Sequence, residues 1–197
     1  VNCTTPSNYF HVLRRQMHRE FRKPLIIMTP KSLLRHKKCI SELKEFATKS
    51  SFHRVLEDDS YSKKNNLISL KSDNKINKVV ICSGKIYYDL VEAREKYKND
   101  KVTFVRLEQL YPFPAKTLAN ILKRYKKANF IWCQEEPKNM GAWNTVRNYI
   151  VRTLKMINFT NIDVKYVGRQ ASSSTATGNA NKHLAQQKEI LEKILKT

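Results

Sequence analysis

The sequence predicts an α/β fold in which a five-stranded, mostly parallel sheet carries helices on both faces, giving three layers. Two observations support this prediction. Strand-like apolar runs alternate with helical patterns along the chain, and most of the loops that join them are short. Such alternation is typical of parallel strands joined by crossover helices. The apolar runs are also continuous, as expected for strands that are buried on both faces.

Five short apolar runs are the predicted strands. They are Leu25–Met28, Val79–Cys82, Val102–Val105, Phe130–Cys133 and Val164–Val167. We expect Val79–Cys82 and Phe130–Cys133 to be central strands. Any antiparallel edge strand is expected to be Val164–Val167, because it follows a long helix.

Segments with apolar residues at helical spacing are the predicted helices. They are Pro6–Phe21, Ser41–Ala47, Ile86–Tyr97, Pro114–Tyr125, Trp143–Ile157 and Asn179–Leu195. The first carries an apolar stripe opposite an arginine-rich side, and the stripe consists of Tyr9, Phe10, Leu13, Met17 and Phe21. The polar stretch His36–Lys78 interrupts the alternation and is predicted to be a partly mobile excursion. The small, polar segment Gly168–Gly178 is predicted to connect to the last helix.

The strongest compositional signal is positive charge, with 38 Lys and Arg against 17 Asp and Glu and a formal net charge of +21. A nucleic-acid surface is one interpretation, because basic patches gain affinity by releasing counterions from phosphates. A set of solvated basic faces is the other. The basic runs Lys37–Lys38, Lys63–Asn66 and Lys123–Lys127 are scattered, which favours solvated faces. A free-standing basic α/β module that binds nucleic acid or a nucleotide remains the alternative function.

The cysteines and the apolar segments limit the possible classes of protein. No two of the four cysteines have the CxxC spacing of zinc or redox motifs. Cys82 and Cys133 lie inside apolar runs and are predicted to be reduced and buried, which favours a reducing compartment. No apolar stretch approaches the roughly 20 residues that a membrane-spanning helix needs. The chain opens on Val1, so we expect a processed or truncated start.

Polar residues follow several predicted strands, where open parallel sheets bind ligands. Ser83-Gly84-Lys85 opens a helix and could face an anion, but it lacks phosphate-loop spacing, which favours a simple turn. Glu135 and Glu136 could act as general acids, although adjacent carboxylates more often neutralise a helix N-terminus or an interface. The five histidines have no metal-ligand spacing. The residues therefore predict no catalytic group and no metal site in this chain.

Several blocks of sequence resemble one known family. They are Tyr9–Gln16, Arg22–Ile26, Thr29–His36, Cys82–Leu90, Val105–Pro114, Trp132–Pro137 with Gly141–Trp143, and Tyr166–Arg169. In this order they are similar to the thiamine-diphosphate-dependent first component of 2-oxoglutarate dehydrogenase. The resemblance covers nearly the whole chain, and its most specific blocks are Lys31–His36 and Trp132–Pro137.

The resemblance implies that residues 36–197 form a domain like the C-terminal domain of transketolase. Residues 1–35 would then be the end of the pyrimidine-binding domain and a linker. The full enzyme would decarboxylate 2-oxoglutarate in the tricarboxylic acid cycle, using thiamine diphosphate and magnesium. It would transfer the succinyl group to the lipoyl arm of the second component. The resemblance also implies a homodimer, in bacterial cytoplasm or the mitochondrial matrix. Because the catalytic and cofactor-binding residues lie upstream, we expect this fragment to be inactive and to bind neither cofactor.

Some members of the family bind acetyl-CoA on this domain as an allosteric effector. The positions that match such a site, for acetyl-CoA or AMP, are Arg15, Ser51, Arg54, Gln109, Lys116 and Thr117. Ser51 and Arg54 depart from the family pattern, which has a lysine and a serine there. We predict that Arg15, Arg54 and Lys116 converge on one anion site.

Overall fold

The computed structural model describes residues 1–62 and 67–196, so the basic run Lys63–Asn66 lies outside the described residues. Two compact units divide the chain, Val1–Arg54 and Val55–Thr197. The resemblance had suggested a boundary after residue 35, and that domain assignment stays a prediction.

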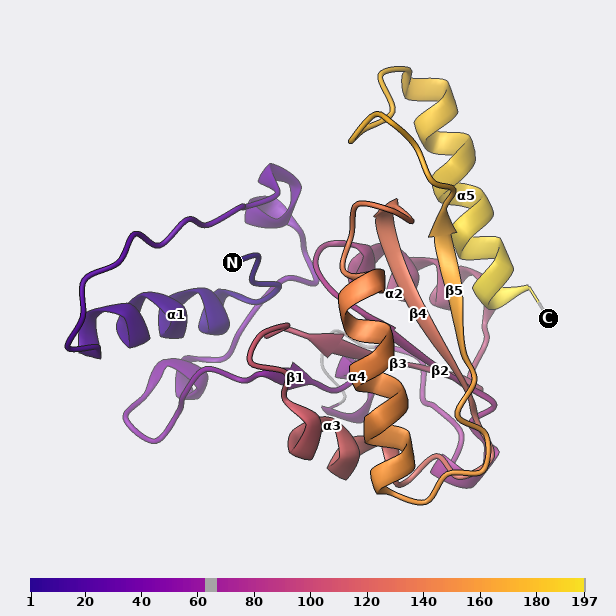
Figure 1. Cartoon of the computed structure of the whole chain (residues 1–197), viewed down its shortest axis with the longest axis horizontal. Helices are drawn as coiled ribbons and strands as arrows, with labels where there is room; N and C mark the ends of the chain where they lie inside the picture. Colours follow the sequence, from indigo (N-terminus) through magenta and orange to yellow (C-terminus); the bar gives the residue numbers. More distant parts are fainter. Residues whose placement is uncertain (63–66, 197) are drawn as a thin grey trace. The chain divides into compact units, whose positions relative to one another are not determined.

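The second unit contains a five-stranded sheet in the order β1-β3-β2-β4-β5 (Figure 1). Its strands are β1 (Val55–Leu56), β2 (Lys78–Cys82), β3 (Val102–Leu107), β4 (Asn129–Pro137) and β5 (Val164–Arg169). Strand β2 pairs in parallel with β3 and β4, and β4 pairs in parallel with β5. The predicted mostly parallel sheet is therefore confirmed, with β2 at its centre and β4 inside it.

Helices cover both faces of this sheet. Helices α3 (Ala115–Leu122) and α4 (Trp143–Met156) pack together on one face, and α2 (Ile86–Tyr97) and α5 (Ala180–Leu195) on the other (Figure 1). Successive residues of a strand point to opposite faces. Val79 and Ile81 of β2 accordingly join the apolar cluster under α3 and α4. All four helices match the predicted ones, although α3 ends three residues before the predicted end at Tyr125.

The prediction of the antiparallel strand was wrong. Strand β5 returns through a crossover helix and runs parallel to β4, whereas β1 pairs antiparallel with β3. Strand β1 comes from the polar stretch that we had predicted to be an excursion. Beyond β1, the same stretch contributes short 3₁₀ turns at Asp59–Ser62 and Asp73–Lys75. Two residues without a longer apolar run carry almost no strand signal, so the sequence could not reveal this edge.

The first unit contains α1 (Pro6–His18) and 3₁₀ turns at Lys31–Arg35 and Leu43–Phe46. The predicted strand Leu25–Met28 is wrong. Ile26 is 71% and Met28 is 67% exposed. The backbone of this run pairs with Val1, whose amino group donates to the Ile26 carbonyl and whose carbonyl accepts from the Met28 N–H. An apolar run forms a strand only where a neighbouring strand can pair with it.

The apolar stripe of α1 is not buried either. Tyr9, Phe10 and Leu13 are each about 40% exposed, and Met17 is more so. The buried face instead holds Ser7, Asn8, His11 and Val12. The Asn8 amide donates to the His53 carbonyl at 3.0 Å and accepts from the His53 N–H at 2.9 Å. Specific hydrogen bonds to a distant segment thus orient α1 against its apolar pattern.

Candidate functional site

A cavity of about 270 Å³ lies within the first unit. Its lining is rich in cationic and imidazole side chains, because it contains three arginines and two histidines beside one serine and one phenylalanine: Arg14, Arg15, Arg54, His11, His18, Ser51 and Phe52. Helix α1 supplies one wall, because the residues at positions 11, 14, 15 and 18 share one helical face. The segment just after the 3₁₀ turn at Leu43–Phe46 supplies the other wall.

Aromatic and backbone contacts hold two of the three arginines of this cavity in place. The guanidinium carbon of Arg15 lies 4.4 Å from the centroid of the Phe52 ring, a cation–π geometry. The Nη2 atom of Arg14 donates to the Ser50 carbonyl at 3.3 Å. Burial and the nearby Arg19 and Arg54 cations lower the pKa of Arg15. The cations at this site are thus gathered where an anion would relieve their repulsion.

Three of the six predicted effector residues, Arg15, Ser51 and Arg54, line this one cavity. The prediction missed His11, Arg14, His18 and Phe52. The helical spacing of the first three was a visible signal, because it places them beside Arg15.

The other three predicted effector residues belong to the second unit. The Gln109 side chain donates through Nε2 to the Pro112 carbonyl at 2.8 Å. Lys116 and Thr117 are exposed on the first turn of α3. The convergence of Arg15, Arg54 and Lys116 stays a prediction.

Carboxylates and cations pair with one another at the carboxyl ends of β2 and β4. Lys85 Nζ lies 3.1 Å from Asp89 Oδ2 and 3.5 Å from Glu135 Oε2. Burial opposes the charge of Lys85, but these two carboxylates outweigh it and raise the Lys85 pKa. Burial raises the pKa of Glu135. At least one of the two adjacent glutamates therefore neutralises a cation of its own unit.

The Gln134 side chain forms hydrogen bonds that account for much of the structure of the Trp132–Pro137 motif. Its buried side-chain oxygen accepts from the Trp132 ring N–H at 2.8 Å and from the Trp143 backbone N–H at 3.0 Å. Its Nε2 donates to the Pro137 carbonyl at 3.1 Å. A Cβ added at Gly141 would lie 2.3 Å from the same Nε2. The motif thus joins the end of β4 to the start of α4 and is structural.

Within residues 1–62 and 67–196, no three or more His, Cys, Asp or Glu side chains are grouped so that they could hold a metal ion. In the same part of the chain, no helix has the length and apolar character needed to cross a membrane. Cys82 and Cys133 are buried free thiols, as predicted. Burial raises the pKa of Cys82 to about 12.

The sheet order and the two helical layers define a three-layer α/β domain of the transketolase C-terminal type. A family model described as "2-oxoglutarate dehydrogenase C-terminal" matches residues 40–195. The chain belongs to this family, which confirms the resemblance seen in the sequence.

Curated relatives support this assignment. The chain is 57% identical over 195 residues to the 2-oxoglutarate dehydrogenase E1 component of Brucella anthropi, a match that covers 99% of the chain and 20% of that protein. The corresponding protein of Brucella ovis is also 57% identical, with 99% of the chain and 19% of that protein covered. The chain therefore spans about a fifth of the length of these relatives.

Proposed function

We propose that this chain is the C-terminal structural, regulatory and dimer-forming region of a 2-oxoglutarate dehydrogenase first component. The similarity to such proteins along 99% of the chain is the observation that supports this proposal. The whole enzyme decarboxylates 2-oxoglutarate on thiamine diphosphate with magnesium and transfers the succinyl group to the lipoyl arm of the second component. It works as a homodimer in a multienzyme complex of the tricarboxylic acid cycle, in bacterial cytoplasm or the mitochondrial matrix.

In this proposal the chain alone is inactive and binds neither thiamine diphosphate nor magnesium, because the residues that hold them lie in the upstream part of the enzyme. Titration calorimetry of the 197-residue chain with thiamine diphosphate and Mg²⁺ tests this. Heat of binding with a dissociation constant in the micromolar range would contradict the proposal.

We further propose that the cavity in the first unit receives the phosphate groups of an effector, acetyl-CoA or AMP. The residues proposed to contact the ligand are Arg15, Ser51, Arg54, Gln109, Lys116 and Thr117, of which the first three line the cavity. The support is the chemistry of the cavity. Guanidinium groups match phosphate oxygens in geometry, and an anion offsets the repulsion among clustered cations.

Ligand-induced thermal stabilisation tests the effector proposal. A ligand that binds only the folded state stabilises it by about 2.7 kcal/mol at a hundredfold excess over its dissociation constant. We expect acetyl-CoA or AMP to raise the melting temperature of the chain, and Arg15→Ala to remove most of that shift. Arg22→Ala, an exposed arginine outside the cavity lining, is the matched control. An undiminished shift in Arg15→Ala would refute the placement of the ligand.

A second variant tests the contribution of the second unit. Lys116→Ala should reduce the ligand-induced shift if Lys116 reaches the same anion, whereas Lys127→Ala should leave it unchanged. A shift in Lys116→Ala equal to that of the unmodified chain would restrict the site to the first unit.

A further inference from the structure

The layer formed by α3 and α4 has a charge of a single sign. Residues 115–128 and 143–160, which form these helices and the loops after them, contain no Asp or Glu. The same segments hold eight cations: Lys116, Lys123, Arg124, Lys126, Lys127, Arg147, Arg152 and Lys155. The basic residues are scattered along the sequence, but in this layer the carboxylates that would balance them are missing.

Seven of these cations have no ion-pair partner among the described residues. Arg124 is the exception, since it pairs with Glu57 and lies 3.7 Å from Asp73. The other seven are exposed, and we call them the basic face: Lys116, Lys123, Lys126, Lys127, Arg147, Arg152 and Lys155. No carboxylate of the described chain lies within ion-pair distance of any of them. Like charges gathered in this way repel one another and attract an anionic partner.

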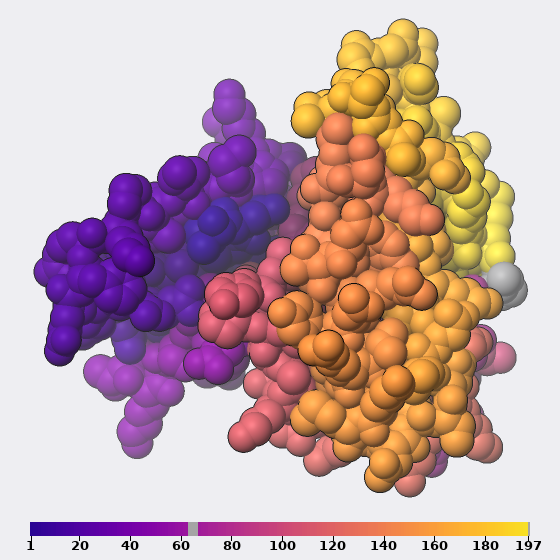
Figure 2. All heavy atoms as spheres, viewed as in Figure 1, coloured from indigo at the N-terminus to yellow at the C-terminus, as the bar shows by residue number. Residues whose placement is uncertain are grey.

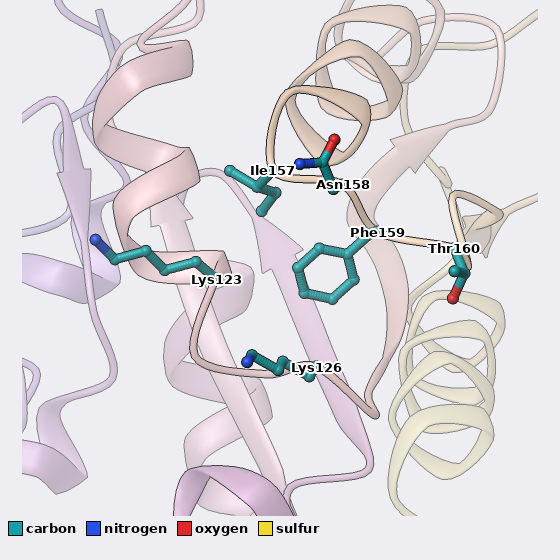
Figure 3. A pocket seen from close by; sticks show the side chains of 6 residues that line it. All are labelled: Lys123, Lys126, Ile157, Asn158, Phe159 and Thr160. Carbon is teal, nitrogen blue, oxygen red and sulfur yellow. The ribbon is translucent and has the colours of Figure 1, made fainter.

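A hollow of about 400 Å³ opens at one end of the basic face, between the loops that follow α3 and α4 (Figure 3). Its lining combines two lysines with apolar and small polar residues: Lys123, Lys126, Ile157, Asn158, Phe159 and Thr160. Figure 3 shows the Phe159 ring pointing into the hollow from the loop after α4, with the lysine stems across from it. The volume lies within the range of small-ligand pockets, and a single apolar side chain would also fit.

We propose that the basic face is a docking surface for an acidic polypeptide segment of a partner protein. An apolar side chain of that segment occupies the hollow beside Phe159, and flanking carboxylates reach Lys123 and Lys126. Complementary charge accelerates association and selects the partner, whereas the buried apolar anchor supplies most of the affinity. This inference does not depend on the effector site proposed above.

The packing of the aromatic rings around the hollow favours a polypeptide over a nucleic acid as the partner. The Phe159 ring packs edge-on against Phe130, with 5.3 Å between the ring centroids, so it is held as part of the wall. Single-stranded nucleic acids instead bind to aromatic side chains on which successive bases stack. The Tyr149 ring of α4 likewise stacks on the Phe113 ring, with 5.1 Å between the ring centroids.

Fluorescence anisotropy with labelled peptides tests the inference on the 197-residue chain. The probe is a peptide of aspartate and glutamate with one central leucine. We expect it to bind, and to bind about tenfold more weakly to the double variant Lys123→Glu/Lys126→Glu, because the variant loses two exposed ion pairs with the peptide and repels its carboxylates. A peptide with serine in place of the leucine should also bind more weakly to the unmodified chain.

The matched control makes the same change of net charge on the other layer. It is Lys182→Glu/Lys188→Glu, which replaces two exposed lysines of α5. We expect this control to retain nearly full affinity. Equal weakening of both double variants would overturn the proposal, because binding would then follow net charge alone. Equal binding of the leucine and serine peptides would remove the role of the hollow, and tighter binding of a single-stranded oligonucleotide or of anionic vesicles would assign the face to another partner.

Discussion

The two helical layers of the second unit cover the same sheet but differ in whether their charged side chains form ion pairs within the layer. On α5, Lys193 lies 2.6 Å from Glu189, and Lys196 just after the helix lies 2.8 Å from Glu192. At the start of α2, Lys85 pairs with Asp89 at 3.1 Å. The layer of α3 and α4 has no carboxylate for such pairs. Figure 2 shows how side chains of α4 and its neighbours form the surface on the side of the basic face. One layer pairs part of its charge within itself, and the other leaves its charge available to a partner.

The buried sides of the layers differ as well. Under α2, Arg94 is fully buried and pairs with Asp58 through Nη1–Oδ2 and Nη2–Oδ1 distances of 2.5 and 3.0 Å. Arg106 donates to Asp59 at 2.9 Å and lies 3.8 Å from the Tyr87 ring centroid. The layer of α3 and α4 rests on an apolar cluster, with Gln134 as a buried polar anchor. The layer of α2 and α5 thus contains ion pairs on its buried side as well as on its surface, whereas the layer of α3 and α4 packs mainly through apolar side chains.

The largest expected loss of stability comes from breaking the buried ion pair between Asp58 and Arg94. Asp58→Ala would leave the Arg94 guanidinium fully buried without its counter-ion, which typically destabilises a protein by about 3–5 kcal/mol. Asp58 also accepts from the Phe104 N–H at 2.9 Å, so the edge of the sheet would lose a second contact. Urea denaturation measures the change, and exposed Asp163→Ala is the control. A loss no larger than that of the control would show that the pair does not stabilise this layer.

The next effect tests the polar anchor beneath α4. Gln134→Leu leaves the Trp132 ring N–H and the Trp143 backbone N–H without their acceptor, at a cost of about 1–3 kcal/mol for each buried group. Gly141→Ala should also destabilise, because its Cβ would approach Gln134 Nε2 to 2.3 Å. Both changes can be followed by thermal unfolding, with exposed Gln170→Leu as the control. Unfolding temperatures equal to that of the control would mean that the motif has another role.

The strands of the chain show which parts of the fold could be predicted from the sequence and which could not. The runs Val79–Cys82 and Phe130–Cys133 were predictable because burial on both faces demands continuous apolar sequence. Leu25–Met28 has the same pattern but pairs with no strand, so its apolar sequence alone led to a wrong strand prediction. Strand β1 was missed because Asp58 and Asp59 anchor the residues just after it through long-range contacts to arginines, which no local pattern encodes.

The candidate site shows the same limit. Arg15, Ser51 and Arg54 came from family positions, and their shared cavity depends on how α1 turns within the first unit. Asn8 and His11 set that rotation through hydrogen bonds to His53 and Glu45. The sequence shows that one side of this helix is rich in arginine, but the distant partners of Asn8 and His11 are visible only in the structure.

A smaller effect on the free energy of unfolding is expected when an ion pair is added to α4 or removed from α5. Asn148→Glu places a carboxylate one turn before Arg152 on α4, and such a pair should stabilise the chain by about 0.2–0.5 kcal/mol. Glu189→Gln removes the existing pair with Lys193 on α5 and should cost a similar amount. Both effects should shrink at high salt, because exposed pairs are screened. Urea denaturation at two salt concentrations measures them, and a destabilising Asn148→Glu would contradict the picture of an unbalanced basic face.

The smallest expected effect concerns the pH dependence of stability at the Lys85–Glu135 pair beside α2. Burial raises the pKa of Glu135 despite the nearby Lys85. A carboxyl whose pKa is higher in the folded than in the unfolded chain binds its proton more tightly when folded. Its contribution to stability is therefore fully present below the unfolded pKa and declines as pH rises through the folded pKa.

Glu135→Gln should abolish this decline, so the stability of the variant relative to the unmodified chain should rise from acidic to neutral pH. Glu136→Gln makes the same change of net charge at an exposed neighbouring position and separates burial from charge. Parallel pH profiles for Glu135→Gln and the unmodified chain, measured by urea denaturation, would show that Lys85 fully compensates the buried carboxylate.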